Sequence, residues 1–263
     1  MKKTVEIESI KIAYEELIPE QISSGIPIIF LHDSLGSITV WREFPKMVSE
    51  NTSHRCIIYD RQGYGHSDPF SKVTRNSGYL EEQADFLISF LDQITVETCI
   101  LFGHSDGGSI ALIAAAKYPG RIQGIITEGA HVFVEDITLA GIREAKEMYR
   151  TTDLKTKLIK HHGDKVDALF TAWTETWLTP EFKNWNIEHF LTEIRCPVLT
   201  LYGEKDEYGS LLQLESIYSK ARGYSQKVVI PGIGHTPHKE AREATLAATT
   251  EFIKHQIPGY TCK

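Results

Sequence analysis

Short apolar runs alternate along the chain with segments whose apolar residues recur every three or four positions. Runs that are apolar at nearly every position occur at residues 26–31, 56–59, 99–102, 122–127, 197–202 and 227–230. Such runs predict strands buried on both faces, as in a sheet that helices cover on both sides. Alternating apolar and polar positions at 5–10 and 11–17 predict an opening pair of strands.

Helical patterns lie between these runs, at residues 79–94, 109–118, 211–221 and 240–255. Because strands and helices alternate, the sequence predicts an α/β fold with a mostly parallel central sheet and helices on both faces. We predict a single domain with a core of residues 1–130 and 196–263.

Residues 131–195 contain no convincing strand and are predicted to form a helical cap inserted into the core. This stretch holds three of the four tryptophans, Trp173, Trp177 and Trp185. We predict that Trp173 and Trp177 line an apolar pocket. The alternative is that these aromatic side chains only pack the cap helices together, since aromatics are buried mainly for their area.

Charge and composition narrow the class of partner. The chain has 263 residues, with 28 Lys and Arg against 35 Asp and Glu, and a net charge of −7. No basic stripe appears, so we expect neither nucleic-acid binding nor attachment to an anionic membrane. The balance favours neutral or cationic small molecules as partners.

The lack of a recognisable targeting signal and the spacing of the cysteines predict a cytoplasmic location. The N-terminus lacks the apolar core of a signal peptide, and no apolar run approaches the roughly 20 residues that span a bilayer. The cysteines are Cys56, Cys99, Cys196 and Cys262, and none forms a CxxC pair. The sequence leaves open whether Cys56 and Cys99 lie on neighbouring strands.

The strongest chemical signal is a G-x-S-x-G motif at residues 103–107. It reads Gly-His-Ser-Asp-Gly and stands between the predicted strand 99–102 and a predicted helix. In this context the motif predicts a sharp, strained turn that exposes the hydroxyl of Ser105 as a nucleophile. Gly103 and Gly107 would leave the room that such a turn requires.

A serine nucleophile needs a base and an orienting acid, and both follow late predicted strands. Asp206 stands just after residues 197–202, and His235 lies in a glycine-bracketed loop after residues 227–230. The predicted triad is Ser105, Asp206 and His235. Alternative positions for the acid are Glu204, Glu207 and Glu128. No metal site is predicted, because Pro237 interrupts any helical face that would join His235 to His238.

Two backbone N–H groups must stabilise the oxyanion of the tetrahedral intermediate. One is predicted to come from Asp106, directly after the nucleophile. The other should come from the loop after residue 31, where Ser34 is the first candidate and Leu35 the second. Gly36 would allow the tight return of that loop.

The segment at residues 60–67, Asp-Arg-Gln-Gly-Tyr-Gly-His-Ser, adds a D-x-x-G-x-G-x-S pattern. Together with the other motifs it resembles the α/β-hydrolase superfamily over residues 32–235. Residues 105–108, 111–119 and 203–206 are similar to the valacyclovir hydrolase (biphenyl hydrolase-like) group. The resemblance implies a serine hydrolase that acts on α-amino acid esters and needs no cofactor.

In that group the aspartate after the nucleophile binds the substrate's ammonium group, which implies this role for Asp106. The alternative is that Asp106 only stabilises the first turn of its helix through the helix dipole. Asp33 is a second candidate carboxylate near the site. The sequence departs from the group at His104, where tryptophan is common, and at residues 32–34, which lack the usual glycine. We count Asp33 and His104 among the substrate-binding candidates.

The residues therefore predict a serine esterase that cleaves small-molecule carboxylic esters through an acyl-enzyme. A carbon–carbon bond hydrolase of ring-cleavage dienones would use the same triad. A non-catalytic small-molecule receptor is the alternative from a different class. Enzymes with an aspartate nucleophile are excluded, because Asp106 lies one residue out of register between the glycines of the elbow.

Overall fold

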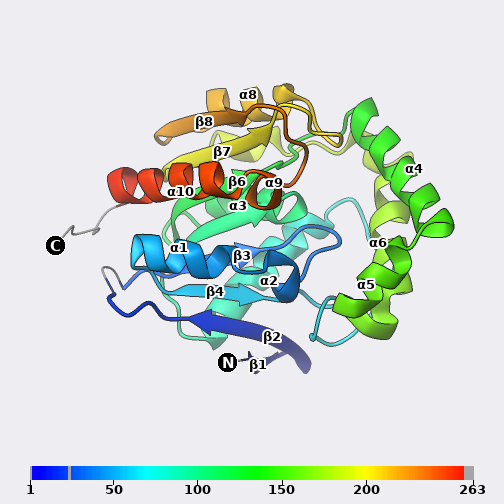
Figure 1. Cartoon of the computed structure of the whole chain (residues 1–263), viewed down its shortest axis with the longest axis horizontal. Helices are drawn as coiled ribbons and strands as arrows, with labels where there is room; N and C mark the ends of the chain where they lie inside the picture. Colours follow the sequence, from blue (N-terminus) through cyan, green and yellow to red (C-terminus); the bar gives the residue numbers. More distant parts are fainter. Residues whose placement is uncertain (1, 23–24, 258–263) are drawn as a thin grey trace.

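The computed structural model describes residues 2–22 and 25–257, so Cys262 lies outside the described part of the chain. One eight-stranded sheet crosses the molecule in the order β1-β2-β4-β3-β5-β6-β7-β8 (Figure 1). The strands are β1 (Lys2–Ile7), β2 (Ile10–Leu17), β3 (Ile28–Leu31), β4 (Cys56–Tyr59), β5 (Cys99–His104), β6 (Ile122–Glu128), β7 (Val198–Gly203) and β8 (Ser225–Ile230). From β4 to β8 all neighbours are parallel, which confirms the predicted α/β class.

The opening strands are antiparallel, but their predicted bounds were wrong. β1 pairs with β2, and the chain reverses at Glu8 and Ser9, whose φ angles are 50° and 67°. Two-residue hairpin turns with positive φ usually contain glycine, asparagine or aspartate. The Glu-Ser pair gives no such signal, so the hydrophobic alternation alone placed the turn too late.

Helices cover both faces of the sheet. α2 (Tyr79–Gln93), α3 (Asp106–Lys117) and α8 (Leu211–Lys220) pack on one face, against side chains such as Ile29 and Leu31. α1 (Phe44–Thr52) and α10 (Arg242–Gln256) pack on the other face, against Ile28 and Phe30. Neighbouring residues of β3 thus belong to opposite cores, as the period of two in a strand requires.

Some helix bounds differ from the prediction. α3 begins at Asp106 rather than 109, because its two glycines look like a turn in sequence. The predicted helix 240–255 is two helices, α9 (Pro237–Glu240) and α10. The 3-10 helix η1 (Ile38–Trp41) and α1 were not predicted. Pro45 near the start of α1 resembles a break in sequence, although proline fits the first helical turn.

Between β6 and β7 the chain is helical. It forms α4 (Asp136–Thr151), α5 (Leu154–His162), η2 (Gly163–Lys165), α6 (Val166–Trp177), η3 (Phe182–Asn184) and α7 (Glu188–Leu191). Its one β contact in the described chain is an isolated bridge between Phe133 and Asn186. In Figure 1, α4, α5 and α6 lie beyond the edge to which the parallel strands point. Side chains at the carboxyl ends of the strands therefore face these helices.

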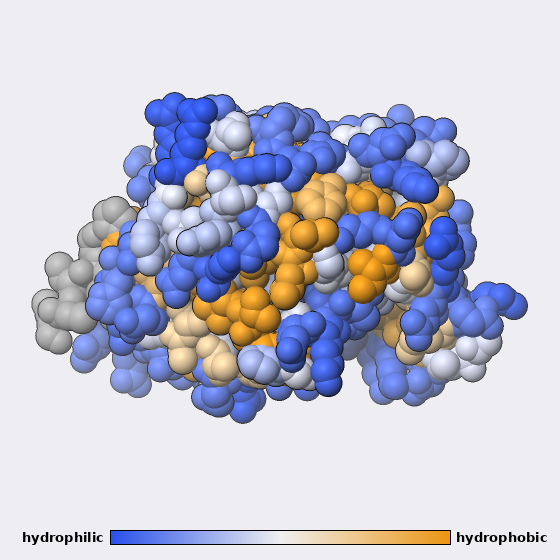
Figure 2. Space-filling view, turned by 90° about the horizontal axis from the view of Figure 1, so that it is seen from above, coloured by the Kyte–Doolittle hydropathy of each residue, from blue (hydrophilic) through white to orange (hydrophobic). Residues whose placement is uncertain are grey.

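Three further observations concern membrane-spanning helices, the cysteines and the surface. No helix in the described ranges is long and apolar enough to cross a bilayer. Cys56, Cys99 and Cys196 carry free thiols, and β3 separates the strands of Cys56 and Cys99. Figure 2 shows a band of apolar residues bordered by hydrophilic ones on the face seen from above. A limited apolar band is ordinary for a globular protein.

Candidate active site

The turn between β5 and α3 holds Ser105 in a strained backbone conformation, with φ 54° and ψ −118°. Positive φ outside glycine costs on the order of 1–3 kcal/mol and persists where the surroundings enforce it. A Cβ on Gly103 would lie 2.3 Å from the carbonyl oxygen of Gly107, and one on Gly107 would lie 2.0 Å from that of Leu31. Both glycines are therefore required by close backbone packing around the serine.

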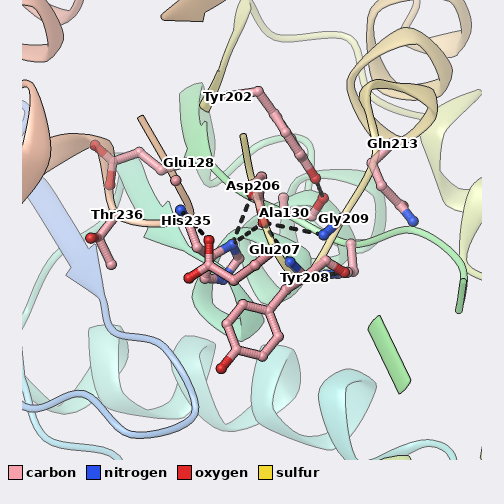
Figure 3. A network of polar contacts seen from close by, with 12 residues as sticks. Glu128, Ala130, Tyr202, Asp206, Glu207, Tyr208, Gly209, Gln213, His235 and Thr236 are labelled. Atoms are coloured by element: carbon pink, nitrogen blue, oxygen red, sulfur yellow. Dashed lines mark hydrogen bonds and ion pairs between the residues drawn. The ribbon is translucent and has the colours of Figure 1, made fainter. Parts of the chain in front are cut away.

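Asp206 and His235 form a buried hydrogen-bonded pair. The Nδ1 atom of His235 lies 2.9 Å and 2.8 Å from the two carboxylate oxygens of Asp206. The N–H groups of Tyr208 and Gly209 donate to Oδ1 of Asp206, which holds the carboxylate between the imidazole and its own loop (Figure 3). Gly129 leaves room for the imidazole, because a Cβ at this position would lie 2.8 Å from the ring.

The pair shifts the pKa values of both groups. Burial lowers the pKa of His235, but the charge of Asp206 and its hydrogen bond outweigh burial and raise the pKa above its ordinary value. Burial raises the pKa of Asp206, but His235 and the N–H of Tyr208 bring it below its ordinary value. Near neutral pH, Asp206 is therefore ionised and stabilises the protonated form of His235.

The rival carboxylates have other partners. Glu128 lies 2.6 Å from Nδ1 of His238, and both side chains are buried. Glu204 accepts a hydrogen bond from the N–H of Gly232. Glu207 accepts one from the backbone N–H of His235, not from its ring. The structure therefore brings Asp206, and none of these three glutamates, to the imidazole of His235.

Ser105 and His235 line one cavity of about 140 Å³. Among the other predicted residues, its wall includes Asp33, Ser34, His104, Asp106, Trp173 and Trp177. Sequence reasoning missed His131, Thr138, Ile142, Glu207 (as a wall residue), Tyr208 and Thr236. His131 and Tyr208 follow the carboxyl ends of β6 and β7. Because ligands bind at the carboxyl ends of parallel strands, this position in the sequence could have identified both residues as candidates.

The oxyanion candidates differ in their hydrogen bonds. The N–H of Leu35 points to Oδ2 of Asp33 at 3.4 Å. No acceptor within the described chain takes the N–H of Ser34 or that of Asp106, and both residues line the cavity. The geometry thus favours Ser34 over Leu35 as the second donor.

The side chain of Asp106 is already engaged within the protein. Its Oδ2 accepts a hydrogen bond of 3.0 Å from the hydroxyl of Tyr79 and lies 3.9 Å from the guanidinium of buried Arg61. Trp177 in turn donates its indole N–H to the Tyr79 hydroxyl. Tyr79 had no sequence signal, and the segment 60–67 that contains Arg61 gave no link to Asp106. Only the packing of α2 and of the loop after β4 brings the two side chains to this carboxylate.

His104 and Asp33 connect the elbow to two loops. The Nε2 of His104 donates to the backbone carbonyl of His235 at 2.9 Å, and its Nδ1 lies 3.8 Å from Oδ1 of Asp33. Burial raises the pKa of Asp33, but His104 and Lys239 lower it well below its ordinary value. His104 therefore holds the backbone of the His235 loop as well as lining the cavity.

Metal-ligand geometry is not found around these residues. Over residues 2–22 and 25–257, no three His, Cys, Asp or Glu side chains converge as a ligand set. The Nδ1 atom of His238 contacts Glu128, so His238 and His235 do not point to a common metal position.

A family model described as the alpha/beta hydrolase fold matches residues 26–187. The match covers more than half of the chain, so the chain belongs to the α/β-hydrolase family. Together with serine-hydrolase relatives, this membership identifies it as a hydrolase.

Among its relatives is the serine hydrolase BPHL of Homo sapiens, 29% identical over 207 residues, which are 75% of this chain and 69% of that protein. The Karrikin insensitive 2 receptor IA of Petunia hybrida is 22% identical, covering 90% of this chain and 93% of the receptor. A solved meta-cleavage product hydrolase from Pseudomonas fluorescens IP01 superposes with a TM-score of 0.71 at 17% identity, covering 95% and 96% of the two chains. At that identity the structural likeness shows the fold alone.

Proposed function

We propose that the chain is a serine hydrolase that cleaves carboxylic esters of small molecules through an acyl-enzyme. The observation that carries the proposal is the shared cavity of Ser105, held in a strained turn, and His235, hydrogen-bonded to Asp206. Neither a packed core nor a surface loop requires this combination. It matches what acyl transfer demands of a nucleophile, a base and an orienting acid.

In the proposed reaction, the hydroxyl of Ser105 attacks the ester carbonyl while His235 accepts its proton. The N–H groups of Ser34 and Asp106 stabilise the resulting oxyanion. The protonated His235, stabilised by Asp206, then donates the proton to the departing alcohol. Water attacks the acyl-enzyme with His235 again as base, which releases the carboxylic acid and restores the serine.

In this proposal residues 131–195 form a cap over the site. Trp173 and Trp177 of α6 belong to the cavity wall, and each also packs against neighbouring aromatic side chains. Such a wall limits water around the reacting carbonyl, so that the hydrogen bonds of the oxyanion are stronger than in bulk solvent.

A fluorophosphonate probe tests the proposal directly. We expect stoichiometric phosphonylation of Ser105, because the probe reacts with a serine hydroxyl only where a base activates it. Intact-protein and peptide mass spectrometry would identify the modified residue. Absence of the adduct, in protein that circular dichroism shows to be folded, would contradict the proposal.

The two alternative functions predict different results in the same substrate assays. A carbon–carbon bond hydrolase would consume a ring-cleavage dienone but leave simple esters intact; the Pseudomonas structure is named a meta-cleavage product hydrolase. A receptor, as the Petunia relative is named, would bind a small molecule with no turnover. Measuring ester and dienone consumption side by side separates these three functions.

A narrower form of the proposal is a preference for α-amino acid esters through Asp106. Because Tyr79 and Arg61 already stabilise its Oδ2, we expect only a modest effect. An α-amino ester should be hydrolysed no more than about fivefold faster than its desamino analogue, about the value of one partly screened ion pair. The kcat/KM ratio of the two esters measures it, and an Asp106→Asn variant should bring the ratio to one. A ratio that survives this substitution would assign the preference to another residue.

We further propose a reducing, cytoplasmic location. Cys56 and Cys99 are fully buried free thiols, and burial raises the pKa of Cys196 to about 12. Such thiols behave as small apolar side chains rather than as partners for disulfides. Recovery of the protein from a secreted fraction of its native cells would contradict this location.

A further inference from the structure

A second cavity adjoins the one that holds Ser105. It measures about 240 Å³ and shares Asp33 and Leu35 with the first, so the two cavities meet at the loop after β3. Four of its other six wall residues are basic. Arg42 follows η1, Lys157 and His161 come from α5, and Lys239 comes from α9, whereas Val40 and Leu158 are apolar. Core and cap elements therefore converge their positive side chains on one space beside the oxyanion loop.

Two of the three cations of this cavity have no ion-pair partner in the described part of the chain. Lys157 pairs with Asp153 at 2.9 Å, but in the described ranges neither Arg42 nor Lys239 forms an ion pair. Asp33 is the one carboxylate on the wall, against three permanent cations. Such an excess is unexpected in a chain whose net charge is −7. Arg42, Lys157 and Lys239 are all exposed to solvent, so their field is screened by salt and should weaken as ionic strength rises.

The local electrostatics report the same positive potential. Burial lowers the pKa of His161, and the charges of Lys239, Arg42 and Lys160 lower it further. The charge of Lys239 also helps to keep Asp33 ionised. His161 is therefore neutral near pH 7, and its Nδ1 lies 2.7 Å from the hydroxyl of Thr39.

The backbone holds Arg42 in an unusual conformation. Its φ of 52° and ψ of −134° resemble the φ of 54° and ψ of −118° of Ser105. A strained conformation in a residue other than glycine persists where the surrounding structure enforces it. Positive φ also occurs at Glu8, Ser9, Ser53 and Thr95, but among these six residues only Arg42 and Ser105 line the two cavities. Arg42, which lines the basic cavity, thus has a backbone conformation similar to that of Ser105, which lines the neighbouring cavity.

We propose that this basic cavity is a subsite for an anionic group, and that the preferred substrate is an ester that carries a second, ionised carboxylate. The inference rests on the proposed esterase function. Arg42 supplies the planar donor pair that matches a carboxylate, and Lys239 supplies a second charge next to it. The ester carbonyl would lie at Ser105, and the substrate would extend past Asp33 and Leu35 to the cations. Whole-chain charge had favoured neutral or cationic partners, so the cavity reverses that expectation locally.

Two matched ester pairs test the proposal, one for each end of the substrate. The para-nitrophenyl monoester of adipic acid and para-nitrophenyl hexanoate differ by a charge on the acyl side. Para-acetoxybenzoate and its methyl ester differ by a charge on the leaving group. We expect kcat/KM at low salt to be at least about tenfold higher for the anionic member of one pair, and the advantage to shrink in 0.5 M salt, as screening requires.

Charge-removing variants locate the effect. In an Arg42→Gln/Lys239→Gln double variant, we expect the anionic ester to lose about tenfold in kcat/KM while the neutral ester changes less than threefold. Lys157→Gln should have a smaller effect, because Asp153 already offsets that charge. Arg150→Gln, an exposed arginine of α4 paired with Glu147, is the matched control and should change neither ester. Melting temperatures would show that the variants are folded, and Lys239→Gln alone replaces the double variant if Arg42 proves necessary for folding.

The outcomes separate this inference from the proposed function. Hydrolysis of both members of each pair at equal rates, or unchanged preference in the folded double variant, would overturn the anionic subsite and leave the esterase intact. If no ester is hydrolysed, the esterase proposal fails, and titration of adipate by NMR still decides the subsite. Shifts confined to residues around the basic cavity, lost in the double variant, would support it. Absence of binding to the unaltered protein at millimolar adipate would reject it.

Discussion

Replacing Ser105 with alanine is expected to reduce kcat for para-nitrophenyl esters by about 10⁴- to 10⁶-fold. In the proposed mechanism the hydroxyl of Ser105 forms the covalent bond to the acyl group, and the methyl group of alanine cannot. The strained turn should remain, because Gly103 and Gly107 set it rather than the serine side chain. Initial rates and active-site titration measure the loss.

The matched control is Ser219→Ala, which removes a hydroxyl from the exposed face of α8. It should leave kcat and KM unchanged. Retained turnover in a folded Ser105→Ala variant would mean that another group attacks the ester, and the proposed acyl-enzyme would have to be abandoned.

Asp206→Asn is expected to have the second largest effect, a decrease of about 10⁴-fold in kcat. An amide in place of the carboxylate no longer stabilises the protonated imidazole, and its NH2 group favours the wrong tautomer of His235. Glu204→Gln is the comparison, because Glu204 contacts the N–H of Gly232 rather than the imidazole. It should change kcat by less than about tenfold. A larger loss of kcat in Glu204→Gln than in Asp206→Asn would mean that Glu204, and not Asp206, is the orienting acid.

We also expect Asp206→Asn to shift the pH dependence of kcat/KM. His235 must be neutral to accept the proton of Ser105, so kcat/KM should fall as pH drops through its pKa. Asp206 raises that pKa, which places the inflection above the ordinary histidine value of about 6.5. In Asp206→Asn the raising charge is gone while burial still lowers the pKa, so the inflection should move to lower pH. An unchanged or higher inflection would contradict the assigned pair.

The local parts of the site could be read from the sequence. The elbow depends on residues that are neighbours in the chain, and its two glycines are required by contacts that every strand–turn–helix junction of this kind makes. Asp206 and His235 were found because they follow predicted strands, and the ends of parallel strands meet at one edge. The structure brings that pair together and gives the rival glutamates other partners.

The environment of Asp106 could not be read in this way. Its position after the nucleophile suggested an ammonium site or a helix-dipole residue, and neither possibility included Tyr79 or Arg61. Those side chains reach Asp106 only because α2 packs beside α3 and the loop after β4 carries Arg61 to the same carboxylate. A preference for amino esters therefore depends on how much of the Asp106 carboxylate remains available to bind a substrate ammonium group.

The sequence by itself determined the α/β class, the elbow around Ser105 and the order of the candidate triad. These depend on periodicity and on turn chemistry, which act over a few residues. The tertiary structure alone decided which carboxylate meets His235, what surrounds Asp106, and that Arg42, Lys157 and Lys239 share a cavity. Their convergence depends on how α5, α9 and the residue after η1 come together in the folded chain. Net charge sums over the whole chain, whereas a substrate responds to the charges that folding places within a few ångströms of it.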